Sequence, residues 1–198
     1  RSVALDWSRC HAERFRTWVQ KEGDGGAGSL DSELSEVKDC LCKHRAFIYN
    51  VFSYYCSLGA MHDRFVIGLL EYHRLLRDAE ITDQASKACK ASDLDTIFIS
   101  TNIEERATGT LSSEQRTLND LNVDRALMRF EFFQCLVRVA VAKYIKHRQC
   151  AEASEALERL VGDDIRPRVP PEALHDCDAF RRARLYDRST NEVLSKNQ

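Results

Sequence analysis

Apolar residues recur at intervals of three and four along most of this chain, which is the spacing of one face of an α-helix. The segment from Leu127 to Ile145 carries the strongest repeat. The same period runs through residues 32–57, 69–76, 93–101 and 151–161, and it returns in the tail after Glu172. Because every long periodic segment has the helical period, the sequence predicts an all-α fold with helical extensions at both ends.

The start of the chain predicts one amphipathic helix over residues 3–22, with arginines between its apolar positions. Its aromatic residues Trp7, Phe15 and Trp18 represent a large apolar area. Two interpretations are open: the helix packs on its own domain, or it inserts into a groove of a partner. We take the three aromatic residues as candidate partner contacts and residues 1–22 as an anchor helix.

Three further segments complete the predicted organisation. Four of the eight glycines lie within residues 23–28, so residues 23–31 predict a flexible linker. Residues 32–161 form the main domain, and a helical extension follows over residues 162–198. Near the end of the chain, Asn191-Glu192-Val193 is similar to Ser35-Glu36-Val37, which favours the start of a further repeat. A chance match is the alternative.

Composition narrows the class of protein. The chain has 198 residues, of which 43% are hydrophobic and 30% charged, so it can bury one sizeable core. Its 29 basic and 31 acidic residues give a net charge of −2, which disfavours nucleic acid or an anionic membrane as partner. No apolar run approaches the roughly 18 residues that span a bilayer. Most of the eight cysteines lie in helix-like apolar segments, which favours reduced thiols and a cytoplasmic location.

Two segments share one local pattern. Residues 67–72 and residues 127–132 each contain an aliphatic residue, a glutamate four positions later, and then an aromatic residue that opens an apolar helix. This pattern is typical of the end of an EF-hand loop, where position 12 supplies two carboxylate oxygens to calcium.

The span from residue 33 to residue 145 resembles the EF-hand superfamily, and in particular the divergent EF-hand pairs of long protist proteins of cilia and the cytoskeleton. The residues that carry the resemblance are 52–55, 67–72, 94–99 and 124–144. The resemblance implies two helix-loop-helix units joined by a short β-bridge between Ile67 and Leu127. It also implies that the helices led by Tyr72 and Phe132 frame an apolar groove for a partner helix.

The second loop is a candidate calcium site. Counting back from Glu131 at position 12 gives the other ligands, namely Asp120, Asn122, Asp124 and the backbone carbonyl of Ala126. Position 6 is Arg125, where the sharp turn usually requires glycine, and position 9 is Met128, which offers no oxygen. The loop is therefore either a calcium site or a scaffold that has lost its metal.

The first loop has no comparable ligands, because Ala60, His62 and Arg64 stand at positions 1, 3 and 5 before Glu71. We expect it to be metal-free, with Glu71 favoured at the start of its helix by the helix dipole. Cys40 and His44 share one helix face while Cys42 points away, and no second pair of ligands lies at finger-like spacing, so no zinc site is predicted.

No phosphate-binding glycine loop and no nucleophile motif occurs, so the sequence predicts a non-enzymatic interaction protein with no firm cofactor. The resemblance implies other proteins of a large cytoskeletal assembly as partners, with an axoneme of a cilium or flagellum as the setting and tubulin as one candidate. Two alternatives remain: a calcium sensor that uses residues 120–131, and an accessory subunit of a large enzyme complex.

Overall fold

The computed structural model describes residues 2–10, 13–22, 30–59, 65–103, 126–175, 181–182 and 188–196, and the statements below concern these residues. The chain is predominantly helical, as the sequence predicts. The first half contains α1 (Ser2–Cys10), α2 (Glu13–Glu22), α3 (Leu30–Lys43), α4 (Arg45–Leu58), α5 (Leu69–Asp78) and α6 (Ala91–Ile103). The second half contains α8 (Arg129–Ala140), α9 (Ala153–Arg159), α10 (Arg166–Arg168) and α12 (Arg188–Lys196).

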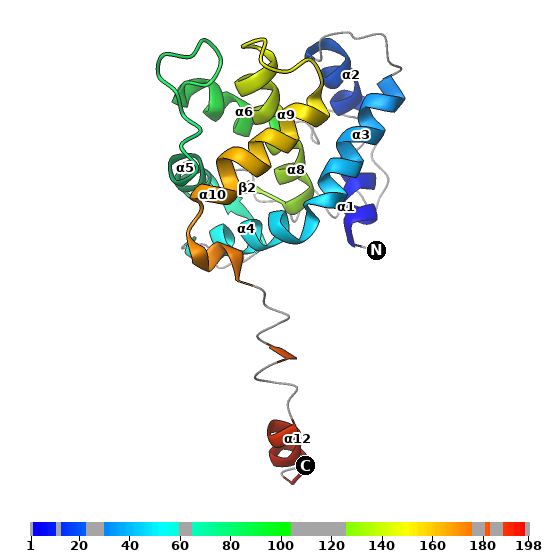
Figure 1. Ribbon diagram of the computed structural model, residues 1–198, viewed down its shortest axis with the longest axis vertical. Coiled ribbons are helices and arrows are strands. Elements are labelled where there is room, and N and C mark those ends of the chain that lie inside the picture. The colour runs from blue at the N-terminus through cyan, green and yellow to red at the C-terminus, as the bar shows by residue number, and fades with distance from the viewer. Residues whose placement is uncertain are drawn as a thin grey trace.

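Helix α8 forms the centre of the body (Figure 1). All but the first of its residues are buried, so it is enclosed by other elements rather than packed on one face. Helices α1, α4, α6 and α9 contact it directly. The strongest hydrophobic repeat of the sequence therefore corresponds to the central helix of the core.

Two short strands, β1 (Ile67–Gly68) and β2 (Ala126–Leu127), form the two-stranded sheet of the described chain. They pair antiparallel, with Ile67 opposite Leu127 and Gly68 opposite Ala126. Both Ile67 and Leu127 are completely buried. The contact expected between Ile67 and Leu127 is confirmed.

The two strands lead into helices in the same way. Gly68 precedes α5 with φ −75° and ψ 169°, and Met128 precedes α8 with φ −69° and ψ 168°. Glu71 and Glu131 are each the third residue of the helix that follows. Ile67 and Leu127 are thus equivalent residues that lie directly opposite each other, which is the arrangement of a local twofold axis.

Both α8 and α9 continue without interruption into π-helical segments, η1 (Val141–Ile145) after α8 and η2 (Leu160–Ile165) after α9. Helix α10 then extends through Pro167 to Arg168, beyond residue 161, where the apolar period of the sequence ends. Pro167 lies in the last turn of this continuous helix and has no N–H to offer the carbonyl of Asp163, four residues earlier. That carbonyl accepts a hydrogen bond of 2.6 Å from Arg168 Nη1 instead. The helix ends before Val169, whose extended backbone precedes Pro170 and the 3₁₀ turn η3 (Pro171–Leu174).

The two ends of the chain differ in how they meet the body. The described residues of the expected 3–22 helix form two helices, of which α1 contacts α8 and α2 contacts α3. Helix α3 begins at Leu30, so the last two residues of the expected 23–31 linker are helical, and residues 23–29 lie outside the described part. Figure 1 shows α12 apart from the body. None of the described helices is long and apolar enough to cross a membrane.

Candidate functional site

Of the candidate calcium ligands, Ala126 and Glu131 belong to the described residues, whereas Asp120, Asn122 and Asp124 lie outside them. Both groups offered as ligands already have protein partners. The Ala126 carbonyl accepts a hydrogen bond of 2.8 Å from the Asn102 amide. The Glu131 carboxylate, 1% exposed, accepts one of 2.7 Å from the backbone N–H of Met128 and so closes the first turn of α8.

Glu71 occupies the equivalent place at the start of α5 and is also buried. Its Oε2 approaches the α-carbon of Gly68 so closely that a β-carbon added there would lie 2.7 Å away. Gly68 leaves room for this carboxylate because it has no side chain. At both helix starts, therefore, a buried glutamate folds back toward the residue that precedes the helix.

The five candidate partner contacts are used within the chain itself. Phe15, Tyr72 and Phe132 are buried in the core, and Trp7 and Trp18 are partly buried against it. The two aromatic residues expected to lead the helices of the groove meet other helices of the body. The Tyr72 ring lies 5.1 Å from that of Phe98 on α6, and the Phe132 ring lies 5.5 Å from that of Phe52 on α4. Of the two interpretations of the N-terminal segment, the structure shows packing on the chain's own domain.

A cluster of polar side chains lies where α3 and α4 meet α9, and the sequence predicted only two of its members. The spacing of Cys40 and His44 placed them on one face, and Glu158 of α9 joins them in the structure. The Glu158 Oε2 atom lies 2.9 Å from His44 Nε2 and 3.6 Å from Cys40 Sγ, while its Oε1 accepts a 2.7 Å bond from Lys43 Nζ. The hydrogen bond from Lys43, with that from His44, lowers the pKa of Glu158 to about 2.

The donor set Cys40, His44 and Glu158 has the chemistry of a zinc site, but its surroundings do not fit a bound ion. A guanidinium only donates hydrogen bonds, so the 3.2 Å contact from Arg166 makes His44 Nδ1 the acceptor. The proton of the neutral ring is then on Nε2, which donates it to Glu158 and offers no lone pair to a metal. A ligating histidine needs the opposite arrangement, with its second nitrogen donating to an acceptor. The cluster is therefore an ion-pair network between helices.

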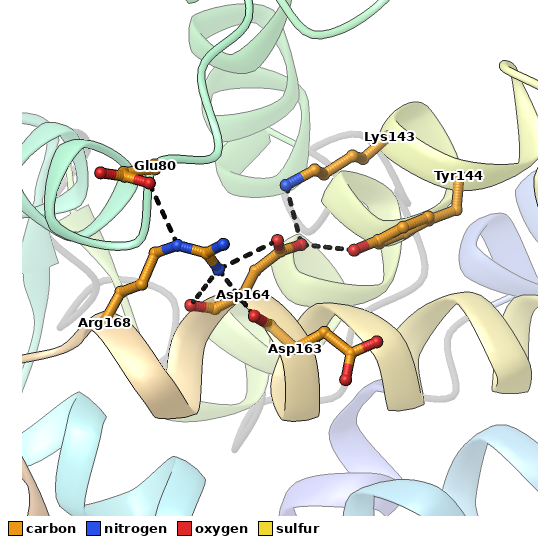
Figure 2. A network of polar contacts seen from close by, with 6 residues as sticks. All are labelled: Glu80, Lys143, Tyr144, Asp163, Asp164 and Arg168. Atoms are coloured by element: carbon orange, nitrogen blue, oxygen red, sulfur yellow. Dashed lines mark hydrogen bonds and ion pairs between the residues drawn. The ribbon is translucent and has the colours of Figure 1, made fainter.

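A second polar network joins the two π-helical segments, and Figure 2 shows three side chains that converge on Asp164. The buried Asp164 carboxylate accepts hydrogen bonds from the Tyr144 hydroxyl at 2.6 Å and from Arg168 Nη1 at 3.3 Å, and it pairs with Lys143 Nζ at 2.8 Å. The pKa of Tyr144 is raised, mainly by burial and further by its hydrogen bond to the Asp164 carboxylate. Arg168 also lies 3.1 Å from Glu80 Oε2, which connects the segment after α5 to α10.

This second network was not predicted from the sequence. Tyr144 belonged to an expected apolar stripe, and the helix was expected to end before Asp164. The four-residue spacing of Asp164 and Arg168 was the one available signal, since such pairs lie on one helix face. All partners of Asp164 hold it in place, so the network is structural.

The described cysteines form no disulfide with one another. Burial raises the pKa of the Cys40 and Cys135 thiols to about 12 and that of Cys89 to about 11. These groups are thiols rather than thiolates at neutral pH, and a thiol is a poor nucleophile.

Comparison of the chain with family models, with curated proteins and with solved structures finds no match in any of the three.

Proposed function

We propose that this chain is a non-catalytic protein-interaction module built on a degenerate EF-hand pair. The observation that carries the proposal is the pairing of Ile67 with Leu127. In an EF-hand pair, the residue at loop position 8 lies four places before the glutamate at position 12, and the two position-8 residues meet across a short bridge. Glu71 and Glu131 stand at that spacing, and the helices that follow begin with matching backbone angles.

The state of Ala126 and Glu131 supports a scaffold that needs no metal. Calcium requires six to eight oxygen ligands, and position 12 normally supplies two of them. Here the Glu131 carboxylate bonds to the start of its own helix, and the Ala126 carbonyl bonds to Asn102. A calcium ion would have to compete with both hydrogen bonds, and Arg125 would add positive charge to the loop.

Two further features support a non-catalytic role in an assembly. The pKa values of the Cys40, Cys89 and Cys135 thiols are raised, which opposes nucleophilic catalysis by these groups. The resemblance to divergent EF-hand pairs of ciliary and cytoskeletal proteins favours a cytoskeletal assembly, with an axonemal microtubule complex as the proposed setting and tubulin as a candidate partner.

Calorimetry with calcium tests the metal-free scaffold. We expect no heat of binding up to millimolar calcium in the full chain, in Glu131→Gln or in the matched variant Glu71→Gln. A signal at micromolar calcium that disappears in Glu131→Gln and persists in Glu71→Gln would make the chain a calcium sensor. That result would overturn the scaffold.

Purification of the full chain from cell extract tests the assembly. We expect it in a stable complex whose other members, identified by mass spectrometry, are cytoskeletal proteins. Recovery of the chain as a free monomer contradicts an assembly role.

A further inference from the structure

The N-terminal helices cover one particular face of α8, which is formed by Phe130, Gln134 and Arg138 and is called the α8 face below. These residues are four positions apart, so they lie in one row along the helix. Cys10 at the end of α1 contacts the first two: its Sγ donates to the Phe130 carbonyl at 2.9 Å, and its carbonyl accepts from Gln134 Nε2 at 3.2 Å. The guanidinium of Arg138 lies 4.6 Å from the centre of the Trp18 ring on α2.

A partly buried ion pair attaches α1 at the start of the same helix. Asp6, only 4% exposed, accepts bonds of 2.7 and 3.1 Å from Nε and Nη2 of Arg129 and a bond of 2.7 Å from the Tyr49 hydroxyl. The Arg129 guanidinium also stacks over the Tyr49 ring at 4.6 Å. Two parallel bonds from one guanidinium to one carboxylate fix the direction as well as the position of α1.

The polar residues of α8 follow a simple rule. Glu131 caps its own helix, and each of the others, Arg129, Gln134 and Arg138, contacts α1 or α2. The remaining residues of α8 are buried, and among them Phe130 also lies against α1. Among the described residues, nothing hydrogen-bonds to the buried Oε1 of Gln134, and such a group is costly in a permanent core. The α8 face therefore has the composition of an interface, with arginine, aromatic and amide groups, rather than that of a core.

We propose that the α1–α2 segment is an exchangeable ligand of the α8 face, and that its other occupant is the α1–α2 segment of a second copy of this chain. A second copy brings the same Asp6, Cys10 and Trp18, so every contact of the closed monomer is reproduced between copies. Residues 23–29 connect the segment to α3 and contain four glycines. This composition is compatible with docking of the segment on its own chain or on a second copy. Intramolecular docking wins in dilute solution, and exchange takes over where copies are concentrated in an assembly. This inference does not depend on the EF-hand assignment.

A charge exchange across the Asp6–Arg129 pair tests the proposal in full-length chains. In Asp6→Arg the closed monomer places two arginines together, and in Arg129→Asp it places two aspartates together. When the two variants are mixed, an exchanged dimer has opposite charges at both of its interfaces. We expect each variant alone to be a monomer with a lowered melting temperature, and the equimolar mixture to consist mainly of a 1:1 dimer by native mass spectrometry and light scattering.

The matched control is the double variant Asp6→Arg/Arg129→Asp, in which the pair is restored with reversed polarity inside one chain. If this control is a folded monomer and the mixture of single variants stays monomeric, the proposal is wrong.

A deletion of residues 23–29 gives an independent decision if the reversed pair does not fold. Helix α2 contacts α3, and two helices that fold back on each other need a loop of about two to five residues. Without a loop, the segment can dock only on another copy, so we expect a dimer. A seven-residue Gly/Ser replacement of the same segment should remain monomeric in dilute solution. A deletion variant that is monomeric refutes exchange.

Discussion

Removal of the Asp164 carboxylate is the sharpest test of the polar core. In Asp164→Ala, the Tyr144 hydroxyl loses an acceptor at 2.6 Å and the Lys143 ammonium loses its counter-ion at 2.8 Å. Figure 2 shows that both side chains point into the site that would be vacated, so neither finds an equivalent partner without moving. The substitution therefore leaves a buried hydroxyl and a largely buried charge without their acceptor.

The expected loss follows from the burial of these partners. Breaking a buried ion pair by removing one member costs about 3–5 kcal/mol. The lower end applies here, because the Lys143 and Arg168 side chains retain 23% and 37% of their exposure to water. We expect Asp164→Ala to lower the free energy of unfolding by about 3 kcal/mol and the melting temperature by roughly 6–12 °C. For Tyr144→Phe, which removes one hydrogen bond, we expect about 1 kcal/mol.

Urea denaturation followed by circular dichroism measures these losses, and Asp163→Ala is the matched control. Asp163 is the neighbouring residue, but its side chain is exposed and points away from the network in Figure 2. Its replacement should change stability by no more than about 0.5 kcal/mol. The double variant Asp164→Ala/Tyr144→Phe should lose less than the two single losses together, because they share one bond. A loss below about 1 kcal/mol in Asp164→Ala, or strict additivity, refutes the assignment of Asp164 as the centre of the network.

Two other outcomes follow from the structure. Leu127→Ala removes a fully buried side chain at the bridge and should lower the free energy of unfolding, measured by urea denaturation, by about 3 kcal/mol. The control Leu70→Ala, at a position 61% exposed, should lower it by less than about 0.5 kcal/mol. Equal losses in the two variants would contradict the bridge as part of the core. The pKa of Glu158 is lowered from 4.5 to about 2, so its contribution to stability is present at neutral pH and is lost as the pH falls through that interval. The stability difference between the wild type and Glu158→Gln should therefore shrink toward pH 2. A difference that stays constant with pH would contradict the ion pair with Lys43 and the hydrogen bond from His44.

The helical fold could be predicted from local patterns, and the contact between residues 67 and 127 could be predicted from the resemblance that one such pattern carries. The apolar period marks the helices, and a repeated aliphatic–glutamate–aromatic spacing marks two equivalent helix starts. The sequence could not show whether Trp7, Phe15 and Trp18 pack within the chain or against a partner. An apolar stripe shows that a helix face will be covered, but the same stripe serves a chain's own core and a partner equally well.

The polar clusters were hidden for a different reason. Lys43 and His44 bind Glu158, which lies more than a hundred residues further along the chain. Asp164 can be buried because Lys143, Tyr144 and Arg168 surround its carboxylate. A hydropathy value is assigned to each residue separately and predicts that acidic residues are exposed. Whether a carboxylate is buried depends on the charged or hydrogen-bonding partners that the fold brings next to it. The π-helical segments that carry Lys143 and Asp164 have no marker in the sequence that distinguishes them from ordinary helix.

The bond between the Glu131 carboxylate and the Met128 amide has a consequence for how such a protein responds to its surroundings. A helix whose first turn is completed by a side chain of the same polypeptide begins at that point whatever the concentration of dissolved ions. A change in calcium concentration would then leave the start of α8 unchanged. In the proposed assembly, such a helix start suits a permanent contact between neighbouring proteins better than the transmission of transient signals.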